Sequence, residues 1–270
     1  MAFENVEVNL EGIDLKGQTV WLCVDNEKFG RRPGPATLAS VGLAVGIPRD
    51  DGSLHLIAKA RFSLSWTDHQ IDKATREEYF DKNPELLPQY LSWVDEAHEW
   101  AVEHFPWAFV DMSGDKTRNN PACRNIVNHI QAHRIAHWID YIERLVHGLG
   151  GSVEIASDFC EFDVADLSAL VYDARNEHAL MYQAIVTPEG AKGYRYRGAA
   201  YNTDHQMARF LPPGKRWGFG SEFAAKFGLT PVVNPSPHLP DADAVAILQE
   251  FLAADHTMNA LVDRSPAPEE

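Results

Sequence analysis

The hydrophobic positions at the start of the chain form three short apolar runs. Residues 19–25, TVWLCVD, are apolar up to the last position and rich in β-branched and aromatic side chains, as is typical of a buried strand. Similar runs follow at 36–47 and 54–66, and PRDDGS between them has the composition of a turn. Three consecutive strands joined in this way predict an antiparallel β-meander.

The pattern changes at about residue 67. Residues 67–120 are acidic and rich in aromatic side chains, which makes this segment too apolar for a linker. We expect a helical insertion packed over the first sheet, with its aromatic side chains in a core of its own. A base-stacking role for some of these aromatic rings is the alternative.

The second half of the chain alternates helix and strand. A long helix is predicted at 122–147, because its apolar positions recur at helical spacing and Gly148 and Gly150 follow it. Strands first and alternating elements afterwards predict an α/β fold, a mixed sheet flanked by helices. Further on we expect a strand at 152–157, helices at about 163–175, 203–211, 221–227 and 241–254, a less regular stretch at 176–200 with a turn at TPEG, and a disordered tail at 255–270.

Composition limits the number of domains and the cellular compartment. The 270 residues are 45% hydrophobic, which suits one large domain, and we place it at 1–254 with the insertion at about 67–120. No run approaches the roughly 18 apolar residues of a membrane span, and MAFENVEVNLEG lacks the features of a signal peptide. Three scattered cysteines without a CxxC pair suit a reducing compartment. We therefore expect a cytoplasmic protein without a membrane partner.

The net charge of −15 excludes one class of function. A protein that coats nucleic acid needs a broad basic surface, which this composition does not provide. An enzyme that holds only a strand end needs a few local cations. In such an acidic chain, divalent metal can neutralise a cluster of carboxylates.

Candidate chemistry begins at WLCVDNEKFGRR. Asp25 and Glu27 are two residues apart on a strand, so their side chains point to the same face and offer hard oxygen ligands suited to Mg²⁺ or Mn²⁺. Alone the pair is a weak signal, because 39 acidic residues give about five or six acid-x-acid pairs by chance.

Two later segments add candidates in a fixed order. In VEIASDFCEFDVADL, a strand is followed by a short turn, Phe162, and then Asp163 at the start of a helix. In PSPHLPDADAV, His238 lies in a proline-rich loop and Asp243 in the first turn of an amphipathic helix, where the helix dipole favours an anion.

The ordered set DxE, FD and HxxxxD resembles the DEDDh 3′-to-5′ exonucleases, the group that includes the proofreading subunit of bacterial DNA polymerase III. Residues 201–229, which run from YNTDHQMARF through PG to GL, are similar to the stretch of that family in which DTLxLAR leads to PG and a further helix. The resemblance covers about 19–66 and 122–254 and leaves the aromatic insertion uncovered.

The resemblance implies a ribonuclease H-like fold and a single exonuclease domain. Two Mg²⁺ or Mn²⁺ ions about 4 Å apart would assist attack on the terminal phosphodiester and release nucleoside 5′-monophosphates. The substrate would be the 3′ end of single-stranded DNA or RNA, or a short oligonucleotide. The residues it implies are Asp25, Glu27, Asp163 and Asp243 as metal ligands and His238 as general base.

The chain also departs from the family. Lys28 replaces the small hydroxyl residue that commonly follows the first motif, and Arg31 and Arg32 either hold phosphate or belong to a solvated loop. This segment is where the terminal sugar is expected, so DNA and RNA are not distinguished. Asn202 and Thr203 stand where a further acid is common.

Two assignments keep an alternative. Asp158 is a rival to Asp163, although the FD pair before an apolar helix favours Asp163. Asp241 either caps the last helix or binds metal.

Three histidines suggest a different site. His129, His133 and His137 form a column on the long helix, and HxxxH geometry can bind zinc. The sequence shows no fourth ligand and no HExxH glutamate, so a polar helix face is the simpler interpretation.

Two functions from different classes follow. The first is a metal-dependent 3′-to-5′ exonuclease. The second is a catalytically inactive module on the same fold that binds nucleic acid or a protein partner through the aromatic insertion. A zinc site on the long helix is a third, weaker hypothesis. The sequence identifies no segment that binds a protein partner.

Overall fold

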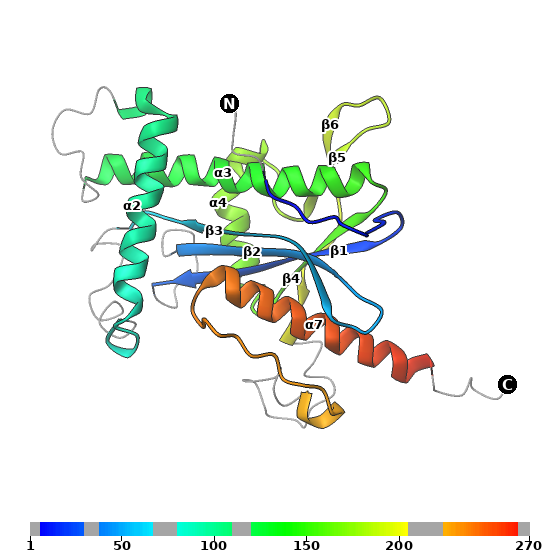
Figure 1. The fold of residues 1–270 in the computed structure, drawn as a ribbon. Helices are drawn as coiled ribbons and strands as arrows, with labels where there is room; N and C mark the ends of the chain where they lie inside the picture. Colours follow the sequence, from blue (N-terminus) through cyan, green and yellow to red (C-terminus); the bar gives the residue numbers. More distant parts are fainter. Residues whose placement is uncertain (1–5, 30–37, 67–79, 110–119, 205–223, 264–270) are drawn as a thin grey trace.

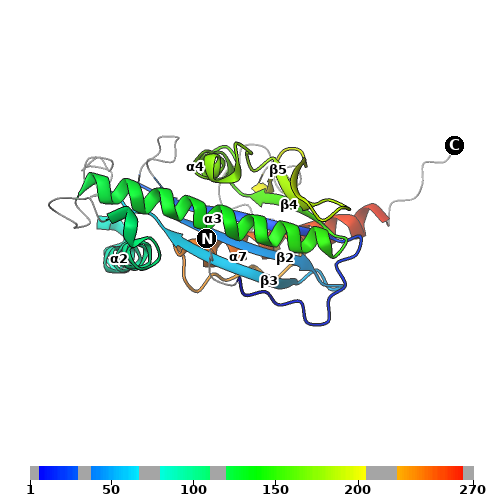
Figure 2. The same ribbon diagram turned by 90° about the horizontal axis from the view of Figure 1, so that it is seen from above.

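The computed structural model describes residues 6–29, 38–66, 80–109, 120–204 and 224–263. Within these ranges the chain has a mixed α/β architecture, a five-stranded sheet with helices on both faces, as the hydrophobic pattern predicts (Figures 1 and 2).

The sheet has the strand order β3-β2-β1-β4-β7. β1 pairs antiparallel with β2, and β2 antiparallel with β3, so the predicted β-meander is confirmed. β1 also pairs parallel with β4, and β4 with β7, which makes the sheet mixed and places β1 at its centre. The strands are β1 (Thr19–Lys28), β2 (Leu38–Pro48), β3 (Leu54–Ser63), β4 (Ser152–Ser157) and β7 (Tyr201–Asn202).

Helices cover both faces of this sheet (Figure 2). α3 (Pro121–Gly148) and α4 (Asp163–Val171) lie on one face and α7 (Pro240–Asp263) on the other. Val20, Leu22 and Val24 of β1 are buried in the core beneath α3 and α4, whereas Cys23 is buried against α7. Because side chains alternate along a strand, Asp25 and Glu27 share the face that α7 covers.

Small side chains let α7 lie close to the sheet. Its Ala244 packs in a cluster with Cys23, Ala44 and Ala156. At Gly42 the approach is closer still, because a Cβ there would lie 2.0 Å from the carbonyl carbon of Pro240. Glycine is therefore required where the first turn of α7 crosses β2.

The predicted insertion is helical in its described part. It contains α2 (Leu86–His104) and a 3₁₀ turn, η2 (Pro106–Phe109). Its aromatic side chains are mostly core residues, which confirms the expected packing. Phe80, Tyr90 and Trp93 form a cluster with Phe29 of β1, and Phe105 and Phe109 pack against α3. The exception is Trp107, which is 70% exposed.

The structure differs from the predicted elements in three places. β1 continues to Lys28, so Asp25 and Glu27 lie within the strand instead of at its end. The helix expected at 163–175 ends at Val171 and is followed by a 3₁₀ turn, η3 (Asp173–Arg175). α7 continues to Asp263, so 255–263 is helical where we expected a disordered tail, and 264–270 lies outside the described residues.

A β-hairpin occupies part of the stretch expected to be irregular. β5 (Tyr182–Val186) and β6 (Lys192–Tyr196) pair antiparallel across the predicted TPEG turn. Arg175, which is fully buried, holds the hairpin on α3 by donating to Asp140 Oδ1 and Glu143 Oε2, both at 2.8 Å, and to the carbonyl oxygen of Tyr182. Most of the helices expected at 203–211 and 221–227 lies outside the described residues.

Membrane insertion finds no support in the described helices. None of them is both long and apolar enough to cross a bilayer.

Candidate metal centre

The centre begins on β1, the middle strand of the sheet. Asp25 pairs with Gly42 of β2, directly below the first turn of α7. Its Oδ2 atom is buried and has no hydrogen-bond partner among the residues that the structure describes. A buried carboxylate oxygen without a donor is costly, so its position calls for a cation.

One group of ligands forms around Asp25. Asp158 follows β4 and Asp163 begins α4, and one carboxylate oxygen from each lies within 4.8 Å of the other two. Ser157 Oγ donates to Asp163 Oδ2 at 3.0 Å, and Asn26 Nδ2 donates to the backbone oxygen of Asp163 at 2.7 Å. The two rivals of the sequence, Asp158 and Asp163, therefore belong to the same group.

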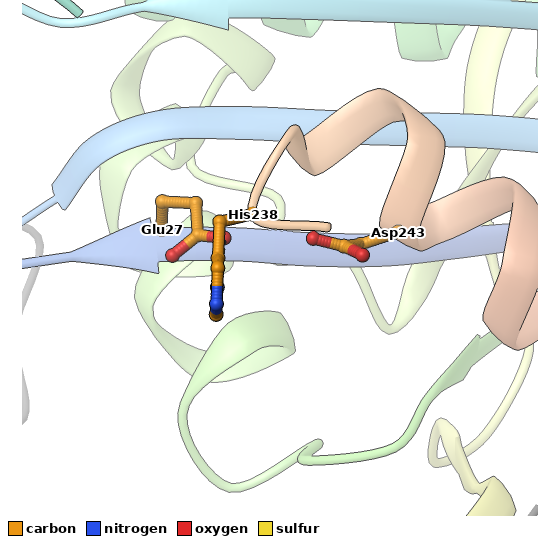
Figure 3. Close-up of side chains that lie close together, drawn as sticks. All are labelled: Glu27, His238 and Asp243. Atoms are coloured by element: carbon orange, nitrogen blue, oxygen red, sulfur yellow. The ribbon is translucent and has the colours of Figure 1, made fainter. Parts of the chain in front are cut away.

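The second group combines Glu27, His238 and Asp243 (Figure 3). Their ligand atoms also lie within 4.8 Å of one another, and His238 Nδ1 is 3.7 Å from Glu27 Oε1. Glu27 comes from β1, Asp243 from the first turn of α7 and His238 from the loop before it. Each of the five residues that the sequence singled out thus belongs to one or the other of the two groups.

The start of α7 fixes the second group. Pro240 is its first residue, where the missing N–H has no cost, and the carbonyl oxygen of Leu239 accepts from the backbone N–H groups of Ala242 and Asp243. Asn234 Nδ2 donates to Asp243 Oδ1. These bonds orient the Asp243 carboxylate toward Glu27 and His238.

The insertion also contacts this group. His238 has a left-handed backbone conformation, with φ of 64°, and Tyr90 of α2 donates its hydroxyl hydrogen to the carbonyl oxygen of His238 at 3.2 Å. Leu239 packs against the aromatic cluster that contains Tyr90. The aromatic insertion therefore supports the loop that carries the candidate general base.

Burial and mutual repulsion govern the electrostatics of the carboxylates. Burial raises the pKa of Asp25 well above its usual range, and Glu27, Asp163, Asp158 and Asp243 raise it further. Burial and then Asp158 raise the pKa of Asp163 to about 8. Burial and then Glu27 raise the pKa of Asp243 to about 6. Asp25 and Glu27, one from each group, lie two residues apart on the same face of β1, so the two groups are adjacent and form one centre.

The same negative charge favours the charged form of His238. The Glu27 carboxylate beside Nδ1 raises the pKa of His238, since it stabilises the imidazolium. The His238 side chain is 48% exposed, so its ring is accessible to a molecule bound at the centre.

The donor set suits divalent cations with a preference for oxygen ligands. Asp25, Asp158 and Asp163 would hold one ion, and Glu27 and Asp243 would hold a second beside His238. Acidic groups on a surface are common without a metal. Here Asp163 is buried and the other carboxylates are half-buried, they repel one another, and one buried oxygen has no donor among the described residues, so a bound cation would relieve these costs.

Other candidates from the sequence have different partners. Lys28 forms an ion pair with Asp166 of α4 and lies 5.2 Å from the centroid of the Phe162 ring. Asp241 is the second residue of α7, and its carboxylate pairs with Lys59 at 3.0 Å and Arg61 at 3.5 Å. Arg31 and Arg32 lie outside the described residues.

One acidic residue was missed by sequence reasoning. Asn202 and Thr203 replace the further acid of the family, but Asp204 comes next, after β7. Burial, Asp158 and Glu250 raise its pKa to about 7. The signal available in the sequence was an acid directly after a strand that ends at the same edge as β1 and β4.

The structure does not bring the three histidines of the described helix α3 together as one group of metal ligands. The rings of His129 and His133 are 4.7 Å apart, and burial lowers the pKa of His133. His137 is close to Tyr141 instead, with ring centroids 6.5 Å apart. Within the described ranges, no group of three metal-binding side chains includes any of the three histidines.

Comparisons with protein families and with curated proteins yield no relative. No protein-family model matches the chain, and no curated protein matches it either. Function has to be argued from the residues of the centre.

Proposed function

We propose that this chain is a metal-dependent 3′-to-5′ exonuclease of the DEDDh type, on a ribonuclease H-like sheet. The observation that carries the proposal is the centre on β1, where two groups of side chains from β1, the β4–α4 segment and α7 lie side by side. The strand order and the antiparallel meander support the fold assignment.

The roles of the residues follow from their positions. Asp25, Asp158 and Asp163 would hold one ion and Glu27 and Asp243 the other, since the ligand atoms of each group lie within 4.8 Å of one another. Two bound ions would supply activation of a water molecule and stabilisation of the charge on the scissile phosphate and the leaving 3′ oxygen. Activation of water and stabilisation of charge both require carboxylates that hold the ions but leave some coordination positions open.

His238 is the proposed general base. Nδ1 faces Glu27, so Nε2 is the atom that accepts the proton of the attacking water. Glu27 orients the ring, and the Tyr90 hydroxyl holds the backbone of the loop. The expected product is a nucleoside 5′-monophosphate released from the 3′ end.

The test is digestion of 5′-labelled oligonucleotides with Mg²⁺, Mn²⁺ or EDTA. Single-stranded DNA, single-stranded RNA and duplexes with 3′ overhangs are compared, and shortening from the 3′ end is followed on gels. We expect Asp25→Asn to reduce cleavage to background. Asp50→Asn, the same change at an exposed residue of the β2–β3 turn, is the matched control.

Two results would overturn the proposal. One is the absence of mononucleotide release with either metal, and the other is full activity of Asp25→Asn. Binding of oligonucleotides without any cleavage would instead indicate the inactive binding module.

A further inference from the structure

Alternate residues of β1 contact different parts of the molecule. Asp25 and Glu27 lie on the face that α7 covers and belong to the candidate metal centre. Asn26, between them, contacts α4, which lies on the opposite face (Figure 2). Its Nδ2 atom donates to the carbonyl oxygen of Asp163, the first residue of α4, at 2.7 Å. The metal-binding strand is thus bonded directly to the helix that carries a ligand of the first group.

Lys28 makes a second contact with α4. Its ammonium group forms an ion pair with Asp166, about one helical turn after Asp163, and lies 5.2 Å from the centroid of the Phe162 ring. The Lys28 side chain is 11% exposed and that of Asp166 is 5% exposed, so salt screens this pair only weakly. We call the contacts of Asn26 and Lys28 with α4 the strand–helix clamp.

Asn26 interrupts an apolar face of β1. Val20, Leu22 and Val24 precede it on this face, and each is buried in the core beneath α3 and α4. Asn26 is 9% exposed, and its Oδ1 atom is buried without a hydrogen-bond partner among the described residues. A buried oxygen without a partner costs stability, and an apolar side chain of similar shape would avoid that cost. The asparagine is therefore better explained by what its N–H group holds than by stability.

The strand–helix clamp opposes a repulsion within the first group. One carboxylate oxygen from each of Asp25, Asp158 and Asp163 lies within 4.8 Å of the other two. Like charges at this distance repel one another, which favours movement of α4 away from β1. Ser157 Oγ donates to Asp163 Oδ2 at 3.0 Å, but Ser157 belongs to β4 and does not join α4 to β1. The clamp supplies that connection.

We infer that Asn26 and Lys28 are positioning residues that hold Asp163 beside Asp25 and so raise the affinity of the first group for a divalent cation. Ligands that are already in place lose less conformational freedom when the ion binds. Both residues act through the start of α4 and not through contact with the ion. The effect on metal binding rests on the candidate metal centre, and the effect on cleavage rests also on the proposed exonuclease function.

The first experiment measures Mn²⁺ binding by isothermal titration calorimetry. Asn26→Leu is the test variant, because leucine has about the shape of asparagine but cannot donate a hydrogen bond. Asn128→Leu is the matched control. Asn128 Nδ2 also donates to a backbone oxygen at 2.7 Å, but that bond joins α3 to Ser65 and not to the metal centre.

We expect the wild type to bind two Mn²⁺ ions. Asn26→Leu should bind one of them about tenfold more weakly, since residues that orient metal ligands typically contribute about 10- to 100-fold to affinity. The other ion, beside Glu27 and Asp243, should keep its affinity. In EDTA, the midpoint of thermal unfolding of Asn26→Leu should stay within about 2 °C of the wild type or rise, because the unpaired Oδ1 atom is removed. Weaker metal binding without a loss of stability distinguishes a positioning role from a structural one.

A double-mutant cycle tests whether Asn26 acts through Asp163. In the Asp163→Asn background, Asn26→Leu should not weaken Mn²⁺ binding further, because the ligand that Asn26 positions is already lost. Lys28→Met should weaken binding of the same ion. Lys28→Arg should restore most of it, since arginine keeps the charge that pairs with Asp166.

The second experiment measures cleavage of a labelled oligonucleotide against Mg²⁺ concentration. Asn26→Leu should need about tenfold more Mg²⁺ than the wild type for half-maximal activity. At saturating Mg²⁺, kcat should stay close to the wild-type value, because His238 and the second group are unchanged.

Three outcomes would overturn the inference. They are equal Mn²⁺ affinity of Asn26→Leu and the wild type, an equal loss in Asn128→Leu, and a further loss from Asn26→Leu in the Asp163→Asn background. If the clamp variants bind Mn²⁺ more weakly than the wild type but no form of the protein cleaves, the positioning role stands and the proposed function fails. A wild type that binds no Mn²⁺ would overturn both.

Discussion

The carboxylates of the centre oppose folding when no cation is bound. Asp163 is 6% exposed, and its neighbours include Asp158 and Glu27. Its raised pKa means that the folded protein holds the proton more tightly than the unfolded chain does. The contribution of Asp163 to the free energy of unfolding therefore falls as pH rises from about 4 toward its pKa of about 8. This is the expected behaviour of a residue selected for a ligand and not for stability.

We predict that Asp163→Asn stabilises the metal-free protein at pH 8. The amide removes the buried charge, so the midpoint of thermal unfolding in EDTA should rise by at least about 3 °C. Mg²⁺ should stabilise the wild type, but the variant only weakly, because a ligand of the first group is lost. Differential scanning fluorimetry with and without Mg²⁺ measures both effects. Asp50→Asn is the control, and a lower midpoint for Asp163→Asn in EDTA would contradict the prediction.

A second residue acts at a distance from the reacting atoms. Tyr90 is a positioning residue, because it contacts the carbonyl oxygen of His238 and not the imidazole. We expect Tyr90→Phe to lower kcat about fivefold, which corresponds to one hydrogen bond of about 1 kcal/mol. KM should change little, since the metal ligands remain.

Steady-state kinetics on a short oligonucleotide tests this prediction. Tyr172→Phe, at a residue that is 42% exposed, is the matched control. Loss of stability with unchanged kcat would show that Tyr90 has only a structural role.

At the scale of elements, the centre depends on how closely α7 approaches the sheet. Its first turn lies over Gly42, beside Asp25, and the small side chains of Cys23, Ala44 and Ala156 continue this contact. An α-helix that lay farther away would separate Asp243 from Glu27. The packing of α7 on small residues is thus a condition for the second group.

We predict that Gly42→Ala destabilises the protein and strongly reduces exonuclease activity. The new Cβ would lie 2.0 Å from the carbonyl carbon of Pro240, so the start of α7 must move. Such overpacking typically costs about 1–3 kcal/mol. Gly193→Ala, in β6, is the control, because a Cβ there meets its nearest neighbours at 3.8 Å. Urea denaturation and the digestion assay provide the measurements, and unchanged activity of Gly42→Ala would contradict the argument.

The sequence predicted these elements to different degrees. Continuous apolar runs and turn chemistry identified β1, β2 and β3, because burial alone determines them. The β5–β6 hairpin was missed, since Arg175, Asp140 and Glu143 hold it from distant positions. Asp25 and Glu27 became candidates through their spacing together with the later FD and HxxxxD segments. That Asp158 and Asp163 both belong to the group of Asp25 was not predictable, because the turn after β4 decides which acids reach β1.

At the scale of the whole molecule, the main apolar core and the candidate metal centre lie on opposite faces of the sheet. The face under α3 and α4 carries the largest apolar cluster. The face under α7 carries a smaller apolar cluster and, next to it, the carboxylates and His238. A chain of net charge −15 repels nucleic acid at long range, so binding at the centre should depend on divalent cations to reverse the local charge.

This electrostatic arrangement predicts that the proposed exonuclease activity rises with pH. His238 has to be neutral to accept a proton, and Asp163 and Asp243 have to be ionised to hold metal. The pKa of each group is raised, for Asp243 to about 6 and for Asp163 to about 8, so activity should increase between about pH 6 and 8. Metal and protons compete for the same carboxylates, and a higher Mg²⁺ concentration should therefore shift this rise to lower pH. Measurement of kcat/KM against pH at two Mg²⁺ concentrations checks both statements. A profile that falls over this range would contradict the role of His238, and a rise that Mg²⁺ does not shift would contradict the role of the carboxylates.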